Sequence, residues 1–171
     1  MASSTSWDLK WSQRPSEEAR NFNPAYCAEL IARVVSEYFR MRQQSFGLAL
    51  SFVVLPIVLH KPTREQLPGN SSASFASWIA DRGPFLVEFP DRTLRLRPVT
   101  REALLFAIQN KVLQVNEGGL APGNSPISRT ARPAKVTDDV AEARSAASLL
   151  GRWFAAQANS TIVLQSFGVS P

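Results

Sequence analysis

One polar cluster in the sequence has residue types that could take part in binding or catalysis. It is His-Lys-Pro-Thr-Arg at residues 60–64, directly after the apolar segment 51–59. A positively charged turn stiffened by proline could hold a carboxylate or a phosphate of a partner. The alternative interpretation is structural: Lys61 and Arg64 end a buried element, and Arg64 pairs with an acid such as Glu102. The sequence leaves both interpretations open.

Motifs of the common enzyme classes are absent from the sequence. It contains no glycine-rich phosphate-binding loop, no HExxH zinc motif and no G-x-S-x-G nucleophile elbow. Cys27 and His60 are the single cysteine and histidine, which excludes an internal disulfide, most zinc sites and a cysteine–histidine nucleophile pair. The adjacent Asp138 and Asp139 are explained by a helix start. We therefore predict a non-enzymatic protein with no catalytic residues, no metal and no cofactor.

Composition indicates one small globular domain. The chain has 171 residues, of which 44% are hydrophobic, and its net charge is +5. This mild basic excess permits a nucleic acid or an acidic protein as a partner but requires neither. The apolar run at 46–59 is shorter than the roughly 20 residues that span a bilayer, and the first 20 residues contain no apolar run typical of a signal peptide. We expect no membrane contact and a cytoplasmic location.

Helix signals occur along most of the chain. Asn23 and Pro24 predict a helix start, Ser72 or Ser74 a short helix, and Thr137 the last main helix. A closing helix is predicted between Ser160 and Gly168. Two segments remain ambiguous between strand and helix, namely 46–59 and the stretch between Pro90 and Pro98.

A helix followed by a hairpin is the next feature. Thr100 predicts a helix start, and the hairpin should have strands at Leu113 and Val115, a turn at 116–119 and a return at Leu120. We assign the buried stripe of this helix to Leu104, Leu105, Ile108 and Val112. The fold class is then mainly α with a small β-hairpin. We predict a flexible N-terminal arm at 1–20 and a single helical domain at 21–171, with a winged-helix-like segment at 98–136.

Several segments together resemble a known protein family. They are NPAYCAELI, LSFVVLPIVLHKPTREQLP, SFASWIADRG, PVTREALLFAIQNKVL, LLGRWFA and TIVLQSFGVSP, and they cover the chain from about residue 23 to its end. They resemble the middle component of three-component ABC ATPase systems, bacterial operons linked to conflict with phage and plasmids that include the Lamassu type. The resemblance implies a non-catalytic adaptor between an SMC- or Rad50-like ABC ATPase and an effector, often a nuclease.

Two sets of surface residues follow from these interpretations. An adaptor would contact its partners through aromatic and basic anchors: Trp7, Trp11, Lys61, Thr63, Arg64, Arg101, Arg152 and Trp153. The alternative is a winged-helix protein that contacts duplex DNA phosphates directly. It would use Arg95, Arg97, Arg101, Lys111 and the basic loop 121–136 with Arg129, Arg132 and Lys135.

Overall fold

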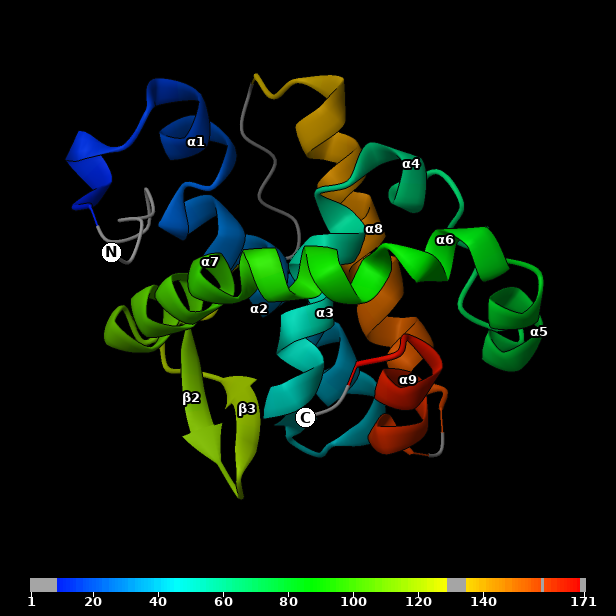
Figure 1. Cartoon of the computed structure of the whole chain (residues 1–171). Coiled ribbons are helices and arrows are strands. Elements are labelled where there is room, and N and C mark those ends of the chain that lie inside the picture. Colours follow the sequence, from blue (N-terminus) through cyan, green and yellow to red (C-terminus); the bar gives the residue numbers. More distant parts are fainter. Residues whose placement is uncertain (1–8, 129–134, 158, 170–171) are drawn as a thin grey trace.

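The computed structural model describes residues 9–128, 135–157 and 159–169. It is mainly helical, with one small antiparallel sheet, which confirms the predicted fold class (Figure 1). The helices are α1 (Ser16–Asn21), α2 (Pro24–Arg42), α3 (Ser51–Val58), α4 (Lys61–Arg64), α5 (Phe75–Ala80), α6 (Gly83–Val87), α7 (Phe89–Gln109), α8 (Asp138–Ala155) and α9 (Ser160–Ser166). The strands are β1 (Phe46–Gly47), β2 (Leu113–Asn116) and β3 (Gly119–Pro122), and 3₁₀ turns lie at Trp11–Gln13 and Leu48–Leu50.

The predicted caps begin the two central helices. The side chain of Asn23 accepts hydrogen bonds from the backbone N–H groups of Ala25 and Tyr26, and Thr137 accepts one from Val140. These bonds satisfy amides that have no partner within the helix. Ser74 caps α5 as predicted, whereas α9 is capped by Asn159 and not by Ser160.

The helices α2 and α8 pack closely together at Gly151. A Cβ at this position would overlap the carbonyl oxygen of Val34 and would lie 2.8 Å from the Cβ of Glu37. Two acids of α2 reach arginines of α8 beside this contact: Glu29 accepts from Arg144 at 2.7 Å, and Glu37 lies 3.5 Å from Arg152. Apolar contact and ion pairs therefore hold the two helices in one register.

The ambiguous segment 46–59 contains both a strand and a helix. Phe46 and Gly47 form β1, and α3 follows after one 3₁₀ turn, with Pro56 inside it. Nearly all residues of α3 are buried, so its apolar composition reflects burial on every side.

The second ambiguous segment is helical, and it joins the helix predicted from Thr100. α7 runs without interruption from Phe89 through Pro98 to Gln109, so the prediction of a start at Thr100 is wrong. The predicted buried stripe is also wrong in part. The inner positions are Thr100, Ala103, Leu104 and Ala107, whereas Leu105 and Ile108 are exposed. Small residues on the inner face let α7 approach α2 and α3.

The hairpin forms where it was predicted, and it gains a third strand. β2 pairs with β3 and β3 pairs with β1, so that Leu120 lies opposite both Val115 and Phe46. Glu117 and Gly118 have positive φ, as two-residue hairpin turns often require. A Cβ at Gly119 would lie 2.7 Å from the carbonyl oxygen of Phe46, so glycine permits the β1–β3 pairing. The order α2, β1, α3, α7, β2, β3 is compatible with the winged-helix expectation.

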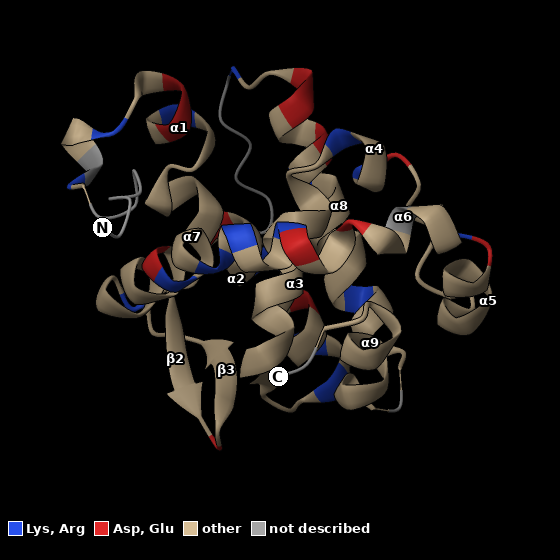
Figure 2. Cartoon of the chain, viewed as in Figure 1, with Lys and Arg blue, Asp and Glu red and all other residues tan. Residues whose placement is uncertain are grey.

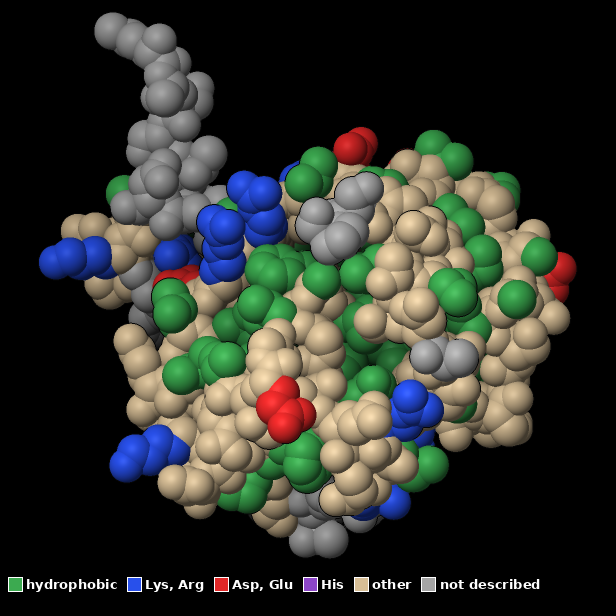
Figure 3. Space-filling view, turned by 90° about the horizontal axis from the view of Figure 1, so that it is seen from below, with side chains coloured by type: hydrophobic (Ala, Val, Ile, Leu, Met, Phe, Trp, Pro, Cys, Tyr) green, Lys and Arg blue, Asp and Glu red, His purple; other side chains and the backbone are tan. Residues whose placement is uncertain are grey.

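An aromatic cluster joins the remaining helices to the core. Trp153 of α8 contacts the rings of both Phe75 and Trp78, with ring centroids 4.9 and 5.2 Å away, and Phe167 stacks on Phe89 at 4.7 Å. The cluster therefore connects α5, α7, α8 and the end of α9. Seen from below, the face that includes the hairpin and α9 carries few charged side chains (Figure 3).

We predict that Gly151→Ala destabilises the protein. Alanine in place of glycine inside a helix usually stabilises by up to about 1 kcal/mol. Here the new methyl group meets the backbone of α2, which cannot rotate away, so we expect a net loss of about 2 kcal/mol in the free energy of unfolding in urea. The control is Gly83→Ala, where no atom lies within 4 Å of the new Cβ. Equal stability of the two variants would contradict the close packing at Gly151.

Candidate functional site

Arg64 of the polar cluster is an internal residue. Its side chain is 4% exposed, and its Nη1 donates to the carbonyl oxygen of Val58 at 2.8 Å. Its Nη2 donates to the carboxylates of Asp139 and Glu142 on α8, the latter at 3.2 Å. The structural interpretation of Arg64 is therefore supported, but its acids are on α8; the suggested pairing with Glu102 is wrong. Arg64 ties the end of α3 to α8.

His60 and Thr63 are also bound within the fold. Thr63 is completely buried, and its Oγ1 accepts from Nη1 of Arg92 at 2.9 Å and lies 2.7 Å from Nδ1 of His60. Burial, followed by the charge of Arg92, lowers the pKa of His60 below its ordinary value. Because Arg92 lies on α7, this network connects α4 to α7. It leaves Lys61 as the exposed cation of the cluster, 3.9 Å from Glu65.

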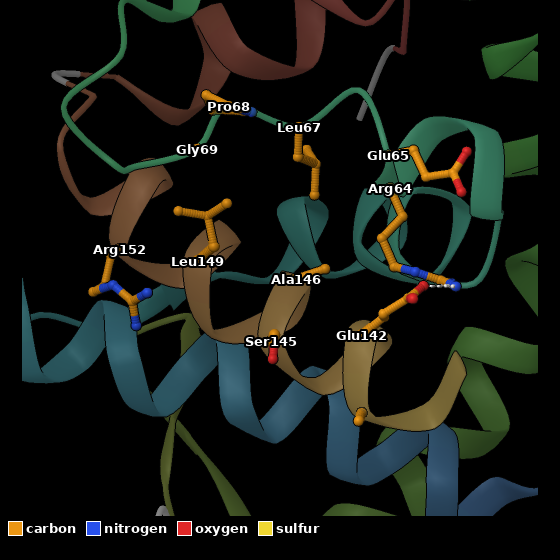
Figure 4. Close-up of a pocket in the computed structure, with 11 residues that line it drawn as sticks. Arg64, Glu65, Leu67, Pro68, Gly69, Glu142, Ser145, Ala146, Leu149 and Arg152 are labelled. Atoms are coloured by element: carbon orange, nitrogen blue, oxygen red, sulfur yellow. Dashed lines mark hydrogen bonds and ion pairs between the residues drawn. The ribbon is translucent and has the colours of Figure 1, made fainter. Parts of the chain in front are cut away.

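A pocket of about 560 Å³ lies between residues 64–69 and α8. Figure 4 shows Leu67, Ala146 and Leu149 between two charged ends, with Arg64 reaching Glu142 at one end and Arg152 at the other. Ser145 is the hydroxyl in the lining, and no base among the described residues hydrogen-bonds to it. The pocket can accept an apolar group, but its lining contains no nucleophile–base pair.

The aromatic candidates differ in their placement. Trp153 is fully buried, and its Nε1 donates to the carbonyl oxygen of Ala73 at 2.8 Å, so it is a core residue and not part of the surface that a partner would meet. Trp7 lies outside the described residues, and only the backbone of Trp11 is described, in a 3₁₀ turn. Arg152 is partly exposed beside the pocket and is held by Glu37.

Basic residues gather on the outer face of α7. Arg95, Arg97 and Arg101 are exposed, and among the described residues none of them forms an ion pair. Figure 2 shows several basic and fewer acidic positions along α7, with α2 and α3 behind the helix. Lys111 and Lys135 are exposed too, whereas Arg129 and Arg132 of the basic loop lie outside the described residues.

Exposed apolar side chains lie before and after these arginines on α7, and the sequence did not predict their exposure. Leu94, Leu105 and Ile108 are all exposed on α7. Leu105 and Ile108 had been assigned to the core. The sequence does contain a pattern that could have predicted the buried face. Thr100, Ala103 and Ala107 recur at helical spacing, and their small side chains fit a close contact with another helix.

The thiol of Cys27, the single cysteine, is buried. Burial raises the pKa of Cys27 to about 12, with a further contribution from Glu102, so the thiol stays protonated. Residues 9–128, 135–157 and 159–169 contain no group of three His, Cys, Asp or Glu side chains that could hold a metal ion. Across the same residues, every helix is too short or too polar to cross a membrane.

Comparison with known protein families finds a match over most of the chain. Residues 11–171 match the family model described as ABC-three component (ABC-3C) system Middle Component 3. No curated protein and no solved structure matches the chain.

We predict that Arg64→Ala lowers the free energy of unfolding by about 2 kcal/mol, because it removes a buried hydrogen bond to Val58 and leaves a void beside α8. Asp139 and Glu142 are half-exposed and can hydrate, which limits the loss. Lys61→Ala is the matched control and should change stability by less than about 0.5 kcal/mol. Urea denaturation measures both. A neutral Arg64→Ala variant would contradict the role of Arg64 as a tie between helices.

A second prediction concerns pH. Because the pKa of His60 is lowered in the folded protein, the unfolded chain binds a proton more readily. The contribution of neutral His60 to the free energy of unfolding is therefore fully present above about pH 6.5 and is lost as the pH drops below that value. His60 is the single histidine, so His60→Gln should reduce the loss in urea midpoint between about pH 7.5 and pH 5.5. Parallel pH profiles for the two proteins would contradict this assignment.

Proposed function

The chain belongs to the middle component 3 family of ABC-three component systems, and from this we propose that it is a non-catalytic adaptor. It would join an SMC- or Rad50-like ABC ATPase to an effector, such as a nuclease, in a bacterial defence complex against phage or plasmids, of which Lamassu is one type. The observation that carries this proposal is the family match over residues 11–171, which places the chain in a three-component system.

The use of polar residues supports an adaptor over an enzyme. Arg64, Thr63 and His60, which are the strongest candidates for chemistry in the sequence, form hydrogen bonds that hold helices together. Cys27 is buried and protonated. An active site needs polar groups that converge on a space where substrate can bind. In the described part of the chain these groups converge on one another.

The outer surface supports binding to protein. Exposed apolar side chains lie on both sides of the arginines along α7, and aromatic, apolar and Arg side chains are typical of interface centres. Arg101 belongs to this face, and Lys61 is exposed on α4. Both remain predicted contact residues.

Direct DNA binding is the second candidate, supported by the element order of the fold and by the arginines of α7. The hairpin is less suited to it. Residues 113–122 contain no Lys or Arg, and Glu117 lies at the turn. Attraction to phosphates dominates DNA affinity, so an uncharged hairpin with an acid at its tip contributes little. The exposed leucines of α7 also lack the hydrogen-bonding groups that read base edges.

Two measurements on purified proteins test the proposal. The chain is co-expressed with the ABC ATPase and the effector of its three-component system, and affinity purification followed by size-exclusion chromatography should recover a stable complex. The chain alone should show no salt-dependent binding to duplex DNA. Failure to form a complex, together with DNA affinity that falls steeply with salt, would replace the adaptor with the DNA-binding candidate. Turnover of a substrate by the isolated chain would contradict the non-catalytic role.

A further inference from the structure

The outer face of α7 carries a continuous stripe along most of the helix. Its members, called here the α7 stripe, follow one another at steps of four, three, four and three residues: Leu94, Pro98, Arg101, Leu105 and Ile108. This spacing places all five on one side of the helix. Leu94 and Leu105 are 62% and 60% exposed, and Ile108 is 37% exposed. The stripe extends over about 21 Å at the rise of an α-helix.

The described part of the N-terminal segment, from residue 9 on, is held on one flank of α7. Arg14 donates to both carboxylate oxygens of Glu102, at 2.6 and 3.1 Å. Glu102 follows Arg101 and therefore lies about 100° around the helix from it. The ion pair holds the segment on this flank of α7, while Leu105, one turn further along the stripe, stays exposed.

A pocket continues the stripe at its N-terminal end. The pocket has a volume of about 720 Å³, and Leu94 and Pro98 of the stripe belong to its lining. Phe22, Leu59 and Leu96 are its other apolar lining residues, and its polar lining residues are His60, Glu88, Arg92 and Arg95. A partner that lies along the stripe could therefore insert one apolar side chain here.

The charge around the stripe is positive. Arg95, Arg97 and Arg101 are exposed on the same helix and Lys111 follows its end, against two exposed acids, Asp91 on α7 and Glu88 directly before it. Glu102 does not offset these charges, because Arg14 already binds it. None of the three arginines has an ion pair among the described residues. The electrostatic complement of this face is an acidic segment.

We propose that the α7 stripe is the docking site for an acidic amphipathic helix of the ABC ATPase component. This inference rests on the proposed function. The helix would have about four turns, with apolar side chains along one face and Asp or Glu on either side. Its apolar face covers Leu94, Leu105 and Ile108, and its carboxylates pair with Arg97 and Arg101.

Other occupants fit this face less well. A second copy of the chain would bring two sets of unpaired arginines together, which repel each other. Duplex DNA would satisfy the arginines but would leave the three apolar side chains against a polar surface. An anionic membrane fits the charge, yet a helix that binds a membrane offers a wide apolar face, and the stripe is one residue wide with an arginine at its centre.

The test uses the chain bound to its purified ATPase, with two variants in the stripe. Leu105→Asp and Arg101→Glu change exposed side chains, so thermal unfolding of the isolated chain should stay close to that of the unmodified protein. Each variant should weaken the complex at least tenfold in titrations at constant salt. The matched controls are Ile162→Asp on α9 and Arg42→Glu at the end of α2, which are exposed outside α7 and should leave the affinity within about twofold.

A photo-crosslinking residue at position 105 identifies the occupant. We expect a crosslink to a segment of the ATPase that has acidic residues and apolar residues at helical spacing. A crosslink to the effector, to a second copy of the chain or to a basic segment would overturn the inference. So would anionic vesicles or duplex DNA that bind the unmodified chain and lose binding in both stripe variants, if the ATPase affinity does not change.

The two proposals fail in different ways. If the unmodified chain and the ATPase form no complex, the adaptor function fails, and the docking site fails with it. If they form a complex whose affinity is the same in Leu105→Asp and Arg101→Glu as in the controls, the adaptor function stands and the α7 stripe is not its docking site.

Discussion

Close packing between α2 and α8 positions most of the molecule. The contact depends on Gly151, where the backbone of α2 occupies the space that a side chain would need. Trp153 and Phe154 follow directly on α8. Trp153 contacts the aromatic rings of α5. Phe154 stacks on Phe46 of β1, with 6.5 Å between the ring centroids. The sheet and the aromatic cluster therefore both pack against the pair formed by α2 and α8. Helix α7 and its hairpin pack against the same core.

Charged residues contribute to this architecture mainly from inside. Burial would raise the pKa of Glu29, but hydrogen bonds from Arg144 and Arg33 keep it below its ordinary value. Arg64 is similarly enclosed, between a backbone carbonyl and two acids of α8. Buried charges need such partners, since desolvation without them costs several kcal/mol per ion. The arginines and acids used in this way stabilise the packing of the helices against one another.

The two faces of α7 differ in composition: the buried face has small residues, and the exposed face has larger apolar and basic residues. The inner face has small residues such as Ala103 and Ala107, which allow the helix to lie close to α2 and α3. The outer face presents Leu94, Leu105 and Arg101 with no partner from the described chain. Arg14 and Glu102 mark the border between these faces by tying the N-terminal segment to the flank of the helix. A rigid helix with one free face is a suitable docking element, because little conformational entropy is lost when a partner binds it.

Local signals in the sequence determined where several elements begin and the type of fold. Asn23, Thr137 and the turn at Gly118 act on neighbouring backbone groups, so they could be interpreted without knowledge of the fold, and the lack of catalytic motifs is likewise a property of the sequence. Tertiary structure alone decided which side of α7 is buried and which acids bind Arg64. Leu104 and Leu105 are adjacent and chemically identical, so only packing against α2 and α3 distinguishes them. Asp139 lies 75 residues from Arg64, a separation that only the folded chain brings within hydrogen-bonding distance.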